Sequence, residues 1–242
     1  MIDVLTNCDR DARSYDFDAM FRARAAVFHD RLGWAVSVSQ GLETDRYDHE
    51  EDPVYLVSTD TEHRLTGSLR ILPTTGETML RNEFADFFDE PVDVESPTVW
   101  ECTRFCVHPR QSASAIDNKR VSSELLIGLC QLCLSSGIEQ VMGLYDHAMT
   151  RVYDRIGWSP VPLARSKTEV GKLVVGIWDV SPEAIEVMMR RIALYDRNFR
   201  LGEVCMPSPS GASAAHPNRR LPRPATSADL WLTAQGGQAG RR

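Results

Sequence analysis

The stretch Thr98-Val-Trp-Glu-Cys-Thr-Arg-Phe-Cys-Val-His-Pro109 organises the rest of the chain. Its β-branched and aromatic residues predict a buried strand, and Pro109 ends the run. Two charged residues, Glu101 and Arg104, stand inside this strand. Burying a charge costs free energy unless the charge is paired or serves a function. The two side chains therefore mark either a structural ion pair or a functional site.

The spacing of these two charges is also unusual for a strand. Successive side chains of a strand alternate between its faces, so residues three apart, such as Glu101 and Arg104, point to opposite sides. Either one of them faces solvent, or a β-bulge turns one of them back, as bulges beside active sites do. The residues alone leave both possibilities open.

Composition describes an acidic globular protein. The chain has 242 residues, of which 43% are hydrophobic, which is ample for a sizeable core. The net charge is −7, and the segment from Cys205 onward holds five arginines and one aspartate. Residues 1–204 therefore carry −11, and so acidic a body argues against general binding of nucleic acid.

The sequence also predicts a cytoplasmic protein. The first residues lack the basic start and apolar core of a signal peptide, and no apolar stretch is long enough to span a bilayer. We therefore expect no membrane association and six reduced cysteines. Cys130 and Cys133 have the spacing of a redox pair, but they lie in a leucine-rich helical pattern and are expected to be buried thiols. No metal site is expected.

Outward from the central strand, apolar periodicity predicts the remaining elements. Strands are expected at 53–59, 64–72, 138–145 and 172–180, helices at 16–31, 118–136, 147–156 and 182–199, and a short helix or irregular segment at 79–88. This order predicts an α/β fold, a mixed sheet flanked by helices on both faces. We expect one domain over 1–204 and a disordered tail, rich in Pro, Ser, Ala and Arg, over 205–242.

Other charged residues also stand in unexpected places. Arg24 lies on the apolar stripe of the first helix, where it either reaches the edge of the stripe or faces an anionic group. Residues 34–52 predict a long acidic loop, and such loops are usually functional or disordered. Asp45 and Asp48 in this loop, with Trp34, suit a cationic ligand, although the loop taken alone is better explained as a solvated surface.

Taken together, the misplaced residues form an ordered set: Arg24, Phe28, Trp34, Asp45, Asp48, Arg70, Phe84, Glu101 and Arg104. The set resembles the signature of the acyl-homoserine-lactone synthases, the autoinducer synthases of bacterial quorum sensing. Thr103 matches the hydroxyl residue that often precedes the arginine in that signature. The match covers roughly residues 1–200. It implies a fold related to that of the N-acetyltransferases, and Val152–Trp158 looks like the helix-to-strand junction of that fold.

The resemblance also implies a reaction. The α-amine of S-adenosylmethionine attacks an acyl thioester and forms an amide. The methionyl carboxylate then displaces the sulfonium, which closes a homoserine lactone and releases 5′-methylthioadenosine. S-adenosylmethionine is a substrate, so no cofactor is expected. The implied partner is an acyl-acyl carrier protein or an acyl-CoA, and the choice between these donors stays open.

Residue chemistry agrees with this reaction. An attacking amine must be neutral, so a carboxylate such as Glu101 can act as general base. Arg104 can hold a carboxylate in bidentate fashion. Aromatic faces and carboxylates stabilise a sulfonium. The expected catalytic set is Glu101, Arg104, Asp45, Asp48, Arg24 and Arg70, and the expected S-adenosylmethionine contacts are Phe28, Trp34, Thr103, Arg104 and Phe105. Arg24 and Arg70 either hold the ligand carboxylate or brace the acidic loop.

The acyl chain is expected in an apolar tunnel between the sheet and helix 118–136. Its expected lining is Phe84, Leu125, Met142, Gly143 and Leu144. Synthases of 3-oxo products often have a threonine at the position of Gly143, so glycine disfavours a 3-oxo chain. The turn Arg110–Ala115 only distantly echoes the phosphate-binding turn of acetyltransferases, which disfavours acetyl-CoA. A basic patch for a carrier protein is expected at Arg151, Arg155, Lys167 and Lys172.

Two rival functions remain at this stage. A small-molecule N-acyltransferase would share the fold but would have no use for Trp34, Asp45 and Asp48. A non-catalytic sensor of the same ligands would be expected to lack Glu101 or Arg104, and both are present.

Overall fold

The computed structural model describes residues 1–110, 113–196, 199, 204 and 205. A single eight-stranded sheet has the order β10-β1-β4-β5-β6-β7-β9-β8. Its strands are β1 (Ile2–Leu5), β4 (Val54–Thr59), β5 (Leu65–Pro73), β6 (Val99–Val107), β7 (Gln140–Asp146), β8 (Val161–Arg165), β9 (Leu173–Asp179) and β10 (Val204–Cys205). The predicted tail after residue 205 lies outside the described residues, so the predicted domain boundary stays a prediction.

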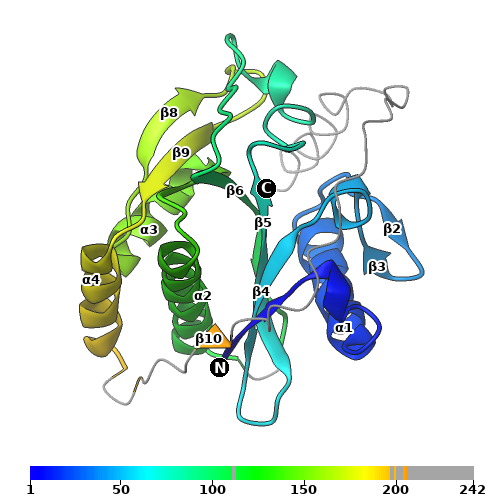
Figure 1. Cartoon of the computed structure of the whole chain (residues 1–242), viewed down its shortest axis with the longest axis vertical. Coiled ribbons are helices and arrows are strands. Elements are labelled where there is room, and N and C mark those ends of the chain that lie inside the picture. The colour runs from blue at the N-terminus through cyan, green and yellow to red at the C-terminus, as the bar shows by residue number, and fades with distance from the viewer. Residues whose placement is uncertain (111–112, 197–198, 200–203, 206–242) are drawn as a thin grey trace, which may run out of the picture.

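Helices cover both faces of the sheet, as predicted (Figure 1). They are α1 (Ser14–Arg24), α2 (Ala115–Ser135), α3 (Thr150–Ile156) and α4 (Pro182–Ala193). Helix α1 lies on one face, and α2 packs on the other between the sheet and α4 (Figure 1). The mixed α/β class is therefore confirmed. None of the described helices combines the length and apolar composition that a bilayer-spanning helix requires.

Several predicted boundaries were wrong, for identifiable reasons. The helix predicted at 182–199 ends at Ala193. The next two N–H groups, those of Leu194 and Tyr195, bond to carbonyl groups three residues earlier, which is the 3₁₀ pattern common at helix ends. Helix α2 begins three residues before the predicted start, because Ser114 caps it in a reciprocal pair with Asp117. Strands β1 and β8 were missed, since β1 has four residues and the outward-facing edge strand β8 lacks an alternating pattern.

The segment predicted as an irregular loop at 34–52 contains short ordered elements. Strands β2 (Val38–Ser39) and β3 (Leu42–Glu43) form a hairpin, and a 3₁₀ turn, η3, spans Arg46–Asp48. Asp45 caps this turn by accepting the N–H of Tyr47, 3.0 Å away. The remaining short turns are η1 (Asn7–Asp9), η4 (Ala85–Phe87), within the segment predicted at 79–88, and η5 (His147–Met149).

Helix α2 anchors the core. Its face carries the buried Leu125, Leu129 and Cys133, and both Cys130 and Cys133 are buried free thiols, as predicted. The helix lies close to β5 at Gly67, where an added Cβ would stand 2.6 Å from Val121 and 2.9 Å from Leu125. A glycine is therefore needed at this crossing.

Of the two possibilities left open for the central strand, the structure has the β-bulge. Strand β5 pairs Ser68 with Cys106 and Arg70 with Thr103, so Arg104 and Phe105 together oppose a single residue of β5. Arg104 has a φ of +54°, which is unusual for a residue with a side chain. The extra residue turns Arg104 to the face that carries Glu101. The carboxyl group of Glu101 and the guanidinium group of Arg104 accordingly both contact Met79.

Strands β6 and β7 run parallel but pair only briefly. The register joins Val99 to Gln140 and ends at Glu101 and Met142. Both strands continue beyond this point, β6 through the bulge and β7 to Asp146. The bulge and the charged side chains therefore lie where the two central strands stop pairing.

Candidate active site

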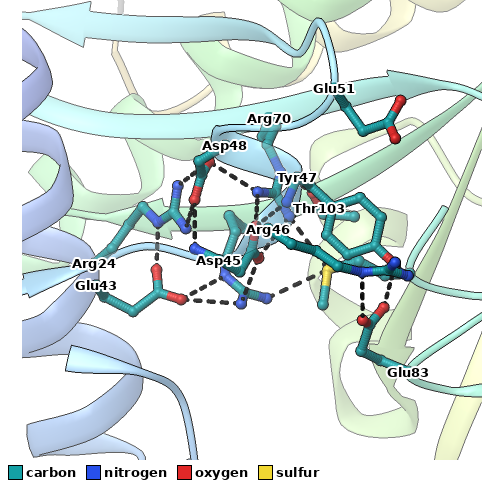
Figure 2. A network of polar contacts seen from close by, with 12 residues as sticks. Arg24, Glu43, Asp45, Arg46, Tyr47, Asp48, Glu51, Arg70, Glu83 and Thr103 are labelled. Carbon is teal, nitrogen blue, oxygen red and sulfur yellow. Dashed lines mark hydrogen bonds and ion pairs between the residues drawn. The ribbon is translucent and has the colours of Figure 1, made fainter. Parts of the chain in front are cut away.

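A buried carboxylate, that of Asp48, stands at the centre of a network of ion pairs. Arg24 donates from Nη1 and Nη2 to its two oxygens at 3.0 and 2.9 Å, and Arg70 Nη1 donates to Oδ1 at 2.8 Å. The Tyr55 hydroxyl adds a bond of 2.7 Å. Burial raises the pKa of Asp48, but the two arginines outweigh it and hold the pKa well below its usual range. Figure 2 shows Asp48 between Arg24 and Arg70.

Asp45 and Glu43 extend the network to the bulge. Asp45 accepts from Arg70 Nη1 at 2.6 Å and Nη2 at 2.9 Å, and it lies 2.9 Å from Arg104 Nη2. The fully buried Glu43 pairs with Arg24 Nε at 2.5 Å and with Arg104 Nη2 at 2.9 Å. Three arginines thus face three carboxylates, and the charges balance.

These contacts show that Arg24 and Arg70 both pair with the acidic segment, which is one of the two roles considered from the sequence. The side chains of Arg24 and Arg70 are at most 1% exposed, and both brace the acidic segment against α1 and β5. Glu43 was missed, although it begins the run of acidic residues that contains Asp45 and Asp48. The signal that could have found it is the acidic composition of residues 43–48, in which Glu43, Asp45 and Asp48 make three of six residues.

Glu101 is buried on the same face and differs from the other carboxylates. It accepts the backbone N–H groups of Met79 at 2.8 Å and Leu80 at 3.0 Å. Burial raises the pKa of Glu101 to about 7, against the opposing effect of these two bonds and of Arg70. Near neutral pH this carboxyl group can therefore both release and take up a proton.

Two predicted aromatic residues meet beside the bulge. Phe28 lies in η2 (Ala25–Arg31), a π-helical turn that continues α1, and such turns are frequent at functional sites. Its ring stacks on Trp34 with centroids 5.1 Å apart and an interplanar angle of 20°. The guanidinium carbon of Arg104 lies 5.6 Å from the Phe28 centroid.

The two remaining residues of the predicted S-adenosylmethionine set are separated by the bulge. Thr103 accepts a hydrogen bond from Arg70 Nε at 3.0 Å and belongs to the network. Phe105 instead packs in the core beneath α2, with Cys102 and Trp100. The bulge turns Arg104, and the next side chain therefore falls on the opposite face.

The structure also divides the predicted acyl tunnel. Phe84, Met142 and Leu144 pack in one apolar cluster with Leu80 and Phe87. Leu125 belongs to the core beneath α2, and a Cβ on Gly143 would stand 3.8 Å from Trp178 of that core. A single tunnel lined by all five residues was therefore a wrong prediction, because successive residues of β7 face opposite sides of the sheet.

A pocket of about 410 Å³ lies between α2, α3 and α4. Lys119, Arg155 and Arg191 line it, together with the apolar side chains of Val152 and Ile156. Of the predicted basic patch of Arg151, Arg155, Lys167 and Lys172, Arg155 lines this pocket. Lys167 lies beside η4, where Nζ donates to the carbonyl oxygen of Asp86 at 3.2 Å.

Comparison with known proteins identifies relatives over most of the chain. The family model described as autoinducer synthase matches residues 9–186. An acyl-homoserine-lactone synthase of Rhizobium etli is 52% identical over 210 residues, covering 87% of this chain and 96% of the relative. One from Agrobacterium fabrum is 31% identical over 159 residues, covering 64% of this chain and 74% of the relative.

Solved structures share the fold. The AHL synthase LasI superposes with a TM-score of 0.66 at 25% identity, covering 81% of this chain and 94% of LasI. The CoA-dependent synthase BjaI, solved with SAM and isopentyl-CoA, gives 0.69 at 24% identity, covering 81% and 90%. The mixed sheet described above is thus the fold of these synthases.

Proposed function

Since this chain belongs to the autoinducer synthase family, we propose that it makes an N-acyl-L-homoserine lactone from S-adenosylmethionine and an acyl thioester. The observation that carries this proposal is Glu101, a buried carboxyl group whose pKa of about 7 suits a general base. It lies on the same strand face as Arg104 and the ion-pair network. Family membership favours this acyltransferase over the rival readings of a plain N-acyltransferase and a sensor.

The proposed reaction has two bond-forming steps. Glu101, directly or through one water molecule, removes a proton from the α-ammonium group of S-adenosylmethionine. The amine attacks the thioester carbon, the amide C–N bond forms, and the C–S bond to the donor breaks, which releases the donor thiol. A carboxylate oxygen then attacks the γ-carbon and displaces the sulfonium sulfur. The products are the lactone and 5′-methylthioadenosine, without any oxidant or reductant.

We assign the remaining site residues by their chemistry. The stacked rings of Phe28 and Trp34 suit the cationic sulfonium, since aromatic faces attract cations. Arg104 suits the substrate carboxylate, because a guanidinium group binds it through two N–H groups. Backbone N–H groups at the bulge can stabilise the oxyanion of the thioester. The ion pairs of Arg24 and Arg70 with Asp48 and Asp45 hold the acidic segment in place, and one N–H group of Arg70 faces Met79 instead of a carboxylate.

The apolar cluster of Phe84, Met142 and Leu144 is the proposed seat of the acyl chain. It lies on the sheet face that carries Glu101, because Glu101 bonds Leu80 and Leu80 belongs to this cluster. Gly143 faces the other side of the sheet, so its lack of a hydroxyl group does not bear on a ketone in an acyl chain seated here. Leu125 and Phe105 pack in the core on the other face of the sheet and are not part of this seat.

The donor carries phosphate whether it is an acyl carrier protein or acyl-CoA, since both attach the acyl group to phosphopantetheine. We propose that its phosphate lies in the pocket lined by Lys119, Arg155 and Arg191 on the α2 face. The pantetheine chain would reach the Glu101 face between β6 and β7, which stop pairing after Glu101 and Met142. Three cations around an apolar floor suit a phosphate on a pantetheine chain.

Product analysis tests the proposed function. The full chain is incubated with S-adenosylmethionine and, in separate arms, acyl-acyl carrier proteins or acyl-CoAs of several chain lengths, and products are identified by mass spectrometry. An acyl-homoserine lactone with an equal amount of methylthioadenosine supports the proposal, and the productive arm names the donor. An acylated amine without methylthioadenosine, or no product in either arm, contradicts it.

A further inference from the structure

Two arginine side chains of the network converge on one sulfur atom. Arg70 Nη2 lies 3.3 Å from the Sδ atom of Met79, and Arg104 Nη1 lies 3.5 Å from the same atom. Met79 is 5% exposed, so the sulfur is shielded from water. The other four N–H groups of Arg70 donate to oxygen atoms of Thr103, Asp45 and Asp48.

A thioether is a poor partner for these donors. Thioether sulfur is a weak acceptor, whereas guanidinium groups bind carboxylate oxygens strongly. The N–H groups of Arg70 and Arg104 that face Met79 are therefore bonded more weakly than those that face Glu43, Asp45 and Asp48. An anionic oxygen in place of the sulfur would be bound more strongly.

The sulfur lies at the flexible end of the Met79 side chain, which packs beside Tyr47 and Leu72. The Met79 backbone N–H is fixed on Glu101, but its unbranched side chain rotates about three bonds. It can swing away without disturbing the bond to Glu101. Arg70, Arg104 and Glu101 all contact Met79. An amino-acid substrate in this place could therefore put its α-carboxylate on the two arginines and its α-amine near Glu101.

We propose that the Met79 thioether holds the place of the substrate carboxylate, between Arg70 Nη2 and Arg104 Nη1. S-adenosylmethionine displaces the sulfur and puts a carboxylate oxygen there, which directs its α-amine toward Glu101. Met79 thereby keeps the two guanidinium groups apart and oriented until the substrate arrives. This inference rests on the proposed function, because it assigns the carboxylate of the proposed substrate to specific atoms.

Substitution of Met79 by a residue with its own carboxylate tests this assignment. Met79→Glu places an anion on a stem of similar length, so the arginine pair would be occupied permanently. Binding is measured by calorimetry on the full chain without acyl donor, using S-adenosylmethionine and its decarboxylated analogue. We expect Met79→Glu to weaken S-adenosylmethionine roughly tenfold or more, the effect of losing a charged hydrogen-bond pair. The analogue, which lacks the carboxylate, should not be weakened.

Matched variants control for general damage to the site. Met79→Leu has no competing acceptor and should bind S-adenosylmethionine at least as well as the wild type. Met149→Glu adds the same charge at a half-buried methionine outside the network and should leave both ligands unaffected. If thermal unfolding shows that Met79→Glu does not fold, Met79→Gln provides a neutral competing oxygen and should weaken only S-adenosylmethionine.

The inference is overturned if the Met79 variant with a competing oxygen binds S-adenosylmethionine as tightly as the wild type, or loses both ligands equally. A wild-type chain that binds neither ligand would instead show that the proposed function itself has failed. Because the wild type is measured first, the two failures are told apart.

Discussion

At the scale of single residues, Glu101 and Asp48 show how burial has opposite outcomes for two carboxyl groups. Both are at most 1% exposed. Asp48 has two arginines bonded to it, so its pKa is held far below the usual value. Among the described residues the hydrogen-bond partners of Glu101 are backbone N–H groups, so desolvation dominates and its pKa rises to about 7. The first is suited to a structural role and the second to proton transfer.

We predict that Glu101→Gln lowers kcat by roughly 10²–10⁴-fold, the usual effect of removing a general base. The wild-type kcat/KM should rise with pH up to about 7, as the free-enzyme carboxyl group ionises. Steady-state kinetics between about pH 5 and 9, a range that includes this pKa, test both statements. An unchanged turnover, or a profile flat through pH 7, would remove Glu101 from this role.

The raised pKa of Glu101 also predicts how the free energy of unfolding depends on pH. Its pKa is about 7 in the folded chain and 4.5 for the ordinary side chain. Between these values the unfolded chain releases a proton that the folded chain keeps, so the free energy of unfolding falls as pH rises through this window. The wild-type curve minus that of Glu101→Gln, from urea unfolding, should show this fall. A difference curve that rises or stays level would contradict the raised pKa.

Asp48→Asn is predicted to be strongly destabilising. It leaves Arg24 and Arg70 buried with one partner fewer, and breaking a buried pair costs about 3–5 kcal/mol. The matched control is Glu62→Gln, whose ion pair with Arg64 is exposed and should contribute under about 1 kcal/mol. Equilibrium unfolding compares the two. Equal losses for both variants would show that the buried network does not stabilise the fold.

At the scale of elements, the bulge in β6 and the close crossing of α2 over β5 set the site. The bulge brings Arg104 to the face of Glu101, and the crossing at Gly67 holds α2 against the opposite face. Both depend on backbone geometry more than on side-chain chemistry. A change in either element should therefore act through packing.

We predict that Gly67→Ala destabilises the fold by about 1–3 kcal/mol, as overpacking of a core does. The added Cβ would meet Val121 at 2.6 Å, so Gly67→Ala combined with Val121→Ala should recover part of the loss. Gly76→Ala, whose nearest neighbour would be 3.4 Å away, is the control. Thermal unfolding gives the comparison, and equal effects of Gly67→Ala and Gly76→Ala would contradict the close crossing.

Much of this architecture could be predicted from the sequence, where the signal is local. The central strand and the core face of α2 follow from apolar patterns, and the phase of Glu101 and Arg104 indicated the bulge as one of two possibilities. The π-helical turn η2 could not, because Ala25–Arg31 has the same apolar pattern as a regular helix. The roles of Glu43 and Met79 depend on partners far along the chain, which spacing does not reveal.

The predicted acyl lining failed for a related reason. Met142, Gly143 and Leu144 are neighbours in sequence, but a strand sends alternate side chains to different faces. Phe105 was likewise displaced by the bulge that turns Arg104. In both cases the sequence names the right strand but not the face.

At the scale of the whole molecule, the net charge is −7, whereas Lys119, Arg155 and Arg191 make one pocket cationic. An acidic carrier protein is repelled by most of the surface, so the pocket should dominate its encounter. We predict that Lys119→Glu and Arg155→Glu lower kcat/KM for the acyl donor while leaving the affinity for S-adenosylmethionine unchanged. Arg190→Glu, on α4 but outside the lining, is the control.

Salt dependence separates this effect from simple misfolding. Added salt screens exposed charges, so the loss in the two pocket variants should shrink as ionic strength rises. Donor kinetics at several salt concentrations provide the measurement. If the Arg190→Glu control loses as much activity as the pocket variants, the pocket is not the donor site.

The central claim, that the substrate's own carboxylate closes the lactone, is tested most directly by an isotope experiment. S-adenosylmethionine labelled with oxygen-18 in both carboxylate positions is turned over with the productive acyl donor, and the lactone is analysed by mass spectrometry. Attack by the carboxylate on the γ-carbon predicts a lactone that retains both labelled oxygens, with an equal amount of methylthioadenosine. A lactone that retains only one label would show that water displaced the sulfonium first, and it would contradict the account.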